Sequence, residues 1–220
     1  MSNVPAVLGA LIADGLSAIG VPGGSTAGEA VKGYLSRRGA EATDLLLEEF
    51  RRAEIDAATA VAEDDRIAII YRYLRASWEG SARVNLRLLA KAIVGRMRTD
   101  NFVADEFMPH ADALAALSRD EIILLAEMYR VHVAHAGSSD DYPWSTVIDN
   151  MEKSGWRKDR TNTTAGRALR SGYVIAVSGW GALVFVPSPL LIDLCKTVDF
   201  DDALLREAKA GVADAARGEA

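Results

Sequence analysis

The chain has 220 residues, half of them apolar, and a formal net charge of −6 at neutral pH. This composition supplies enough apolar surface for one large or two small cores, and the negative charge excludes a general attraction to nucleic acid or anionic lipid. The single cysteine, Cys195, excludes an intramolecular disulfide and favours a reducing, cytoplasmic location. Because it follows leucines in a helical pattern, we interpret it as a buried apolar residue rather than a nucleophile.

The first forty residues are rich in glycine and alanine. Val4 to Val21 carries one charge, Asp14, before Pro22 and two glycines interrupt the apolar run. We expect a helical hairpin over residues 1–40. It would either enter a membrane or be buried in protein, in the bundle or in a homodimer. We favour burial in protein over membrane contact for residues 4–35. A carboxylate at a bilayer centre costs about 2.5–3.5 kcal/mol, and the small apolar side chains gain too little free energy in lipid to offset this cost. No basic segment precedes the run, so we expect no secretory signal.

The next region, residues 41–117, begins with two adjoining segments of opposite net charge. Residues 41–65 carry nine acidic and two basic side chains and predict an acidic helix, whereas residues 66–98 carry eight basic and one acidic. Arg83, Arg87 and Lys91 follow one side of a helix at intervals of four. This stripe could contact phosphates, or the two regions could pack together and neutralise each other. The numbers of charges match and the segments adjoin, so the second interpretation is favoured.

Helix signals continue after residue 98. Residues 101–117 have a helical apolar pattern, and we expect Pro109 either to break it or to open a new turn. Ser118 and Glu121 have the spacing of a capping box and predict a helix start. That helix should reach about Ala136 with four residues inward: Ile122, Leu125, Tyr129 and Val133.

The stretch from Trp144 to Leu194 predicts two helices, a hairpin and a further helix. The first helix covers 146–154 with Ser145 as its cap, and the second covers 161–171 with Gly172 as its stop. Strands follow at 173–178 and 182–186, joined by a type II′ turn with Gly179 at its first central position. Ser188 and Pro189 have the pattern that starts a helix over 190–196. Residues 199–220 form a C-terminal helix or tail.

Helix, helix and hairpin in this order resemble the winged helix-turn-helix superfamily over about 118–195. We therefore expect a mainly α protein, with an N-terminal helical bundle followed by a winged-helix unit with a small β-hairpin. The expected divisions are 1–40, the hairpin; 41–117, the charged bundle; 118–198, the winged-helix domain; and 199–220, the C-terminal helix or tail.

Motifs of catalysis or cofactor binding are missing from the sequence. His132 and His135 lie three apart near Asp140 and Asp141, but this spacing is no known zinc signature. We interpret the histidines as structural or surface residues, and we expect no catalytic residue, no cofactor and no metal.

The best candidate site is a basic cluster around the second helix of the winged unit, with Arg157, Lys158 and Arg160 before the helix. The net charge from Met151 to Tyr173 is +4 in a chain of net −6. Arginine, lysine, hydroxyl and amide side chains at a helix N-terminus suit phosphate and base-edge contacts. The candidate nucleic-acid-binding residues are Arg157, Lys158, Arg160, Thr161, Asn162, Thr163, Thr164, Arg167 and Arg170. The alternatives are a solvated face or a groove for an acidic partner, such as another subunit.

The chain as a whole also resembles bacterial abortive-infection alpha-type proteins. The resemblance rests on the small-residue N-terminus, the charged helical middle, Phe102-Val103 and the string Leu-Ser-Arg-Asp-Glu at 117–121. It implies a role in phage defence. Our leading hypothesis is a non-enzymatic binding or regulatory protein whose winged-helix unit contacts nucleic acid. The alternative is a defence or structural protein that acts through membrane or protein contacts of its N-terminal helices.

Overall fold

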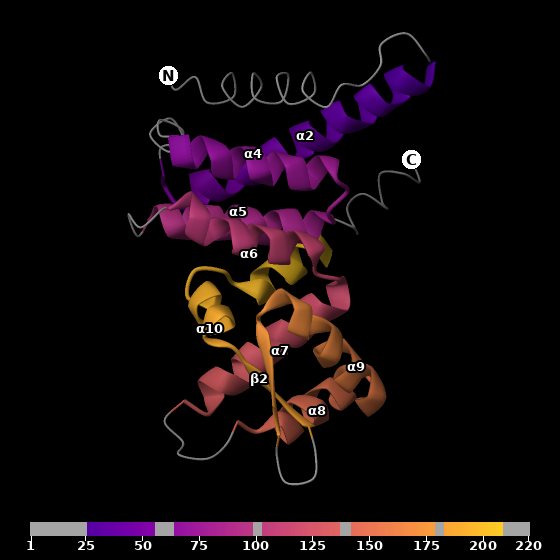
Figure 1. Cartoon of the computed structure of the whole chain (residues 1–220), viewed down its shortest axis with the longest axis vertical. Helices are drawn as coiled ribbons and strands as arrows, with labels where there is room; N and C mark the ends of the chain where they lie inside the picture. Colours follow the sequence, from indigo (N-terminus) through magenta and orange to yellow (C-terminus); the bar gives the residue numbers. More distant parts are fainter. Residues whose placement is uncertain (1–25, 56–63, 99–102, 137–141, 179–182, 209–220) are drawn as a thin grey trace. The chain divides into compact units, whose positions relative to one another are not determined.

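The computed structural model describes residues 26–55, 64–98, 103–136, 142–178 and 183–208 (Figure 1). Contacts divide the chain into two compact units, Met1–Ala116 and Leu117–Ala220. The described residues are mainly helical and contain one two-stranded hairpin, which lies in the second unit. The predicted fold class, a helical bundle followed by a unit with a small hairpin, is confirmed.

The first unit is built from α2 (Thr26–Arg52), α4 (Asp64–Trp78), α5 (Arg83–Met97) and α6 (Ala104–Ala116). α2 packs on α4 and α5, and α6 packs on the same two helices. The core consists of aliphatic and aromatic side chains that are at most 1% exposed, among them Leu46, Phe50, Ile70, Leu74, Leu89 and Ile93. Amphipathic helices are stable here because each buries its apolar stripe against its neighbours.

α2 differs from the expected helix over 41–65 at both ends. It begins at Thr26, runs without a break through residues 40 and 41, and ends at Arg52. Glu54 then has a φ of 57°, a left-handed conformation that a helix cannot continue through. Leu35, Leu45 and Leu46 are buried on the inner face. Their burial stabilises the helix across Gly39, which alone costs about 1 kcal/mol relative to alanine.

The expected burial of residues 4–35 can be compared with the structure only at the start of α2, because the side chains of residues 4–28 lie outside the described part of the chain. Residues 29–34 are exposed, and the side chains of Val31 and Tyr34 are 49% and 42% accessible. The bundle therefore does not cover this turn of the helix. The Pro22 break and the preceding apolar run lie outside the described residues. In the part of the chain that the structure describes, we find no helix with the length and apolarity needed to cross a bilayer.

The basic stripe of α5 faces the glutamates of α2. Arg83 lies 3.1 Å from Glu41, Arg87 lies 3.1 Å from Glu48 and 3.3 Å from Glu49, and Lys91 lies 3.7 Å from Glu49. We call Glu49, Arg87 and Lys91 the buried ion cluster, because their side chains are only 6%, 4% and 12% exposed. The favoured interpretation, mutual neutralisation of the two charged regions, is thus confirmed for this stripe.

Pro109 lies inside α6, so the predicted break or new turn there is wrong. Proline lacks the N–H that would donate to the carbonyl of Asp105. Pro109 and Asp105 are both exposed, so water can satisfy that carbonyl. The helix continues because Phe107, Ala111 and Leu114 are buried on its other side.

The described part of the second unit consists of α-helices, one 3-10 turn and the two strands of the hairpin. They are α7 (Arg119–Ala134), α8 (Trp144–Lys153), α9 (Lys158–Ala168), the 3-10 turn η1 (Leu169–Ser171), β1 (Val174–Ser178), β2 (Leu183–Pro187) and α10 (Pro189–Cys195). Residues 200–208 are also helical. Ser118 forms the predicted capping box with Glu121 at the start of α7, and Ser188 caps α10 with Pro189 at its first position. Both local predictions are confirmed.

The hairpin is antiparallel, as predicted, but its register does not fit the predicted two-residue turn. Ser178 pairs with Leu183, whereas a two-residue turn beginning at Gly179 would have paired Ser178 with Gly181. The prediction of that turn is therefore wrong; residues 179–182 themselves lie outside the described part. The indole of Trp144 in α8 packs edge-on against the buried ring of Phe185 at 5.2 Å between centroids. This contact fixes which face of the hairpin is inward, since side chains alternate along a strand.

Helix boundaries and faces differ from the predictions at three places. Pro143 rather than Ser145 precedes α8, because Trp144 already belongs to the helix and is buried. α9 starts at Lys158, three residues before the predicted start. In α7, Ile122 is fully buried as predicted, but Val133 is 54% exposed. The apolar periodicity continues beyond the part of α7 that other elements cover, and Tyr129 beside it is only half-buried.

Candidate nucleic-acid interface

The inner face of α9 holds two of the nine predicted binding residues. Thr161 and Thr164 are 0% and 3% exposed, and they lie with Ala165 and Ala168 against the rest of the unit. The Thr161 hydroxyl donates to the carbonyl of Arg157 at 3.4 Å. The prediction that both threonines contact nucleic acid is therefore wrong. Because the helix begins at Lys158, positions 161 and 164 turn inward instead of filling its first turn.

Two arginines of the cluster are held by acidic residues of α7. The Arg160 guanidinium lies 2.9 Å from Asp120 and 4.1 Å from the centre of the Trp156 ring. The Arg170 guanidinium lies 2.8 Å from Glu121, whose side chain is completely buried. Moving Arg170 to a ligand would leave a buried carboxylate with one partner fewer, at a cost of about 1–3 kcal/mol. Arg170 is therefore a structural residue of this unit.

Glu121 links the start of α7 to the end of α9. Its carboxylate accepts hydrogen bonds from the Ser118 amide at 2.7 Å and the Ser118 hydroxyl at 2.6 Å, in addition to the ion pair with Arg170. Burial by itself raises the pKa of Glu121, but the Ser118 hydrogen bonds and the Arg170 charge together lower it below its ordinary value. The carboxylate thus stays ionised at neutral pH and holds both partners.

We expect Glu121→Gln to lower the free energy of unfolding by about 1 kcal/mol at pH 7, because it weakens the capping box and the ion pair. A carboxyl whose pKa is lowered by folding stabilises above its unfolded pKa, and this contribution is lost as the pH falls through the folded pKa. Urea unfolding at decreasing pH should therefore show the difference between wild type and variant shrinking in acid. Glu152→Gln, at an exposed position of α8, is the control and should show no such convergence. A difference that stays constant down to acid pH would contradict the assigned role.

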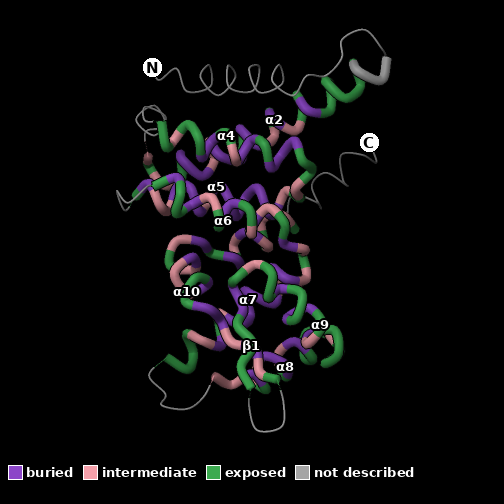
Figure 2. The backbone as a smooth tube through the Cα atoms, viewed as in Figure 1, coloured by how far each residue is buried: buried purple, intermediate pink, exposed green. Residues whose placement is uncertain are grey.

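The outer face of α9 offers a smaller set of contact residues. Lys158, Thr163 and Arg167 are exposed, and within the described part of the chain the Lys158 and Arg167 side chains make no ion pair. Figure 2 shows exposed stretches of the backbone along α9. With about 3.6 residues per turn, Thr163 lies near the middle of the outward side, and Lys158 and Arg167 lie on opposite flanks. The helix thus presents a hydroxyl between two cationic side chains.

Gly166 completes this outer face. A Cβ built at this position would meet nothing within 4 Å, so no neighbour in the described chain requires a glycine there. In a helix interior glycine is less stable than alanine by about 1 kcal/mol. A bare backbone next to Thr163 and Arg167 allows another molecule to approach the helix axis closely.

Arg157 and Asn162 occupy the N-terminal edge of the same helix. Arg157 pairs with Asp159 at 2.8 Å, and both side chains are mostly exposed. The Arg157 hydrogen bond is the main reason that the pKa of Asp159 is lowered. The side-chain oxygen of Asn162 accepts a hydrogen bond from the Trp144 indole at 3.3 Å, which leaves the side-chain nitrogen as the remaining donor group. Asn162 therefore joins α9 to α8 and contributes little else to the surface.

The histidines and the cysteine have structural surroundings. His132 stacks on Tyr129 at 6.3 Å between ring centres, and His135 Nδ1 lies 2.9 Å from the carbonyl of Val131. In the described ranges no three metal-ligating side chains gather at one place. Cys195 is half-buried at the end of α10, and its burial raises the pKa of the thiol to about 12. A protonated thiol is a poor nucleophile at neutral pH.

Comparison with known proteins gives no assignment: no family model, no curated protein and no solved structure matches this chain.

Proposed function

We propose that the unit 117–220 binds duplex nucleic acid non-enzymatically, with α9 as the contacting helix. The observation that carries this proposal is the outer face of α9, where Lys158 and Arg167 flank Thr163 and have no carboxylate partner in the described residues. These are the side chains that phosphate and base contacts require. The proposal keeps Arg157 as a third cation and removes Thr161, Thr164 and Arg170 from the predicted set.

The position of the cations suits a helix lying in a groove. The major groove of DNA is about 12 Å wide and admits one α-helix, which then has a phosphate backbone on either side. Cationic side chains on opposite flanks can reach the two backbones, while Thr163 and the bare Gly166 face the base edges.

The energetic cost of recruiting Arg157 is small. An ion pair between exposed side chains contributes about 0–1 kcal/mol, so Arg157 can exchange Asp159 for a phosphate. Arg160 is more firmly placed, since both Asp120 and the Trp156 ring hold its guanidinium. The negative charge of the whole chain weakens long-range attraction, so we expect modest affinity that depends on these local contacts.

The test is fluorescence anisotropy of labelled random duplexes titrated with the full chain. With three cations releasing counterions, raising the salt from about 50 to about 200 mM should weaken binding about 40-fold. The affinity should be in the micromolar range, which is typical of binding that does not depend on sequence. Absence of any anisotropy change at low salt, across random duplexes, would refute the proposal.

A second candidate function, docking of a partner protein, is favoured by the hairpin. The segment 173–187 contains no charged residue, and Ile175, Val177 and Leu183 are 42%, 40% and 56% exposed. Such a hairpin cannot neutralise phosphates, but exposed apolar side chains suit a protein surface. Under this alternative the titration of labelled duplexes gives no anisotropy change, and α9 contacts an acidic partner such as another subunit.

The wider setting rests on resemblance alone. The order of α7, α8, α9 and the hairpin is the order that suggested a winged-helix unit, a class that serves protein contact as well as DNA binding. We propose a cytoplasmic regulatory protein, with a homodimer as its assembly. The similarity to abortive-infection proteins adds phage defence as the alternative pathway.

A further inference from the structure

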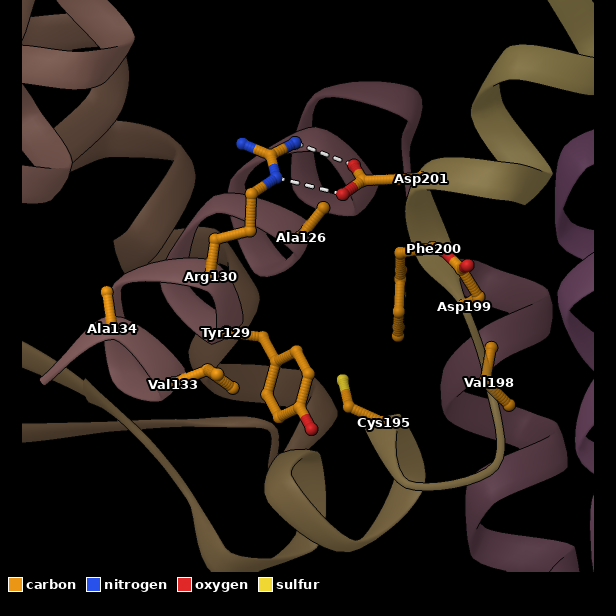
Figure 3. A pocket seen from close by; sticks show the side chains of 10 residues that line it. All are labelled: Ala126, Tyr129, Arg130, Val133, Ala134, Cys195, Val198, Asp199, Phe200 and Asp201. Carbon is orange, nitrogen blue, oxygen red and sulfur yellow. Dashed lines mark hydrogen bonds and ion pairs between the residues drawn. The ribbon is translucent and has the colours of Figure 1, made fainter. Parts of the chain in front are cut away.

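A cavity of about 660 Å³ lies in the second unit, away from α9. Its volume falls within the range of about 300–1,000 Å³ that is usual for small-molecule sites. Its walls come from the second half of α7, the end of α10 and the segment that follows α10. The lining includes Ala126, Tyr129, Arg130, Cys195, Phe200 and Asp201 (Figure 3).

Aromatic and apolar groups form most of the wall. Figure 3 shows the side chains of Tyr129 and Phe200 on opposite sides of the open space, with Cys195 near Tyr129 at one end. Phe200 is 3% exposed and therefore fixed, whereas Tyr129 is half-buried. Two rings on opposite walls provide the dispersion and edge or face contacts that a third ring can use.

The charges at the other end are already satisfied. Arg130 donates to Asp201 through two nitrogens, at 2.9 and 2.6 Å, and also bonds to Glu127. The Arg130 hydrogen bond is the main reason that the pKa of Asp201 is lowered, so this carboxylate remains ionised. Asp199 adds a further negative charge to the lining. An anionic ligand would meet more carboxylates than cations here.

The thiol of Cys195 does not supply a reactive group. Burial, followed by the charges of Asp199 and Asp201, raises the pKa of Cys195 to about 12. The sulfur stays protonated at neutral pH and behaves as a polarizable apolar surface, which packs well against aromatic rings. We therefore expect Cys195 to contribute only a non-covalent contact.

From the lining, the size and the charges we infer that this cavity binds a small, uncharged aromatic molecule between Tyr129 and Phe200. The site lies in the same unit as the proposed nucleic-acid contact but shares no residue with it. Ligand binding in the cavity does not depend on nucleic-acid binding by α9, and each is tested by its own experiment. The site selects for apolar, planar ligands and against anions, because the Arg130–Asp201 pair leaves no unsatisfied cation for an anion to use.

The probe is N-phenyl-1-naphthylamine, an uncharged fluorescent molecule, titrated with the full-length protein. We expect a saturable fluorescence increase and a rise in melting temperature with probe concentration. The anionic analogue 8-anilinonaphthalene-1-sulfonate should bind about tenfold more weakly or not at all. Equal affinities for both probes would overturn the inferred selectivity.

Two variants locate the binding. Ala126→Leu adds methyl groups inside the cavity, and Ala134→Trp covers its exposed edge, so each should weaken binding of the uncharged probe about tenfold. Ala136→Trp, at an exposed position two residues further along and outside the lining, is the matched control and should bind like wild type. Ala134→Trp keeps the test decisive if Ala126→Leu does not fold. Wild type without saturable binding, or Ala134→Trp with unchanged affinity, would overturn the inference.

Discussion

Replacing Arg87 with leucine is expected to lower the free energy of unfolding of the first unit by about 3–5 kcal/mol. Arg87 lies between Glu48 and Glu49, and its side chain is only 4% exposed. The variant leaves the carboxylate of Glu49, which is 6% exposed, with Lys91 at 3.7 Å and the more exposed Arg52 at 4.0 Å. The loss is large because a buried charge is deprived of a partner, and not because the pair itself contributes strongly.

Urea unfolding at neutral pH measures this loss, and Arg75→Leu is the matched control. Arg75 pairs with Glu79 at 2.7 Å on the surface of α4, where both side chains are about half exposed. This second variant should change stability by no more than about 0.5–1 kcal/mol. If the two variants were equally stable, the pairing of α2 with α5 through the buried ion cluster would be contradicted.

Reversing two charges on α9 is expected to weaken binding of duplex DNA by about 100-fold or more. The double variant Lys158→Glu, Arg167→Glu places a carboxylate on each flank of the helix, so both proposed phosphate contacts become repulsive. Both residues are exposed and make no ion pair in the described chain, so the melting temperature should hardly change. Anisotropy titration at about 50 mM salt gives the binding constant.

The control for this variant must change the net charge by the same amount. Lys32→Glu, Arg37→Glu does so at exposed positions of α2 in the other unit. It should bind duplex DNA within about twofold of wild type, since a charge outside the contact acts only through a screened field. Equal weakening by both double variants would mean that net charge, and not α9, controls the affinity.

Two local signals in the sequence predicted helix starts correctly. Ser118 with Glu121, and Ser188 with Pro189, each specify a helix start within four residues, and both starts are confirmed. The neutralisation of Arg83, Arg87 and Lys91 could also be predicted, because opposite charge on adjoining segments is visible without coordinates.

Features that depend on distant residues could not be predicted. Asp120 and Glu121 lie 40 and 49 positions from the arginines that they hold, so the sequence pattern alone does not show that Arg160 and Arg170 are paired with carboxylates. The predicted start of α9 is three residues too late, because Arg157 precedes the helix without a side-chain cap. This shift decides which threonines face inward. The cavity likewise joins α7 to residues about 70 positions later, such as Asp201.

The salt dependence of binding tests the central claim, that α9 contacts phosphates through Lys158 and Arg167, most directly. Each such contact contributes about 0.9 to the slope of log affinity against log salt concentration. The wild-type chain, with Arg157 as the third contact, should give a slope of about −2.7, and Lys158→Ala, Arg167→Ala should give about −0.9. A double-alanine variant whose slope equals that of wild type would show that these side chains do not touch the nucleic acid, and would contradict the account.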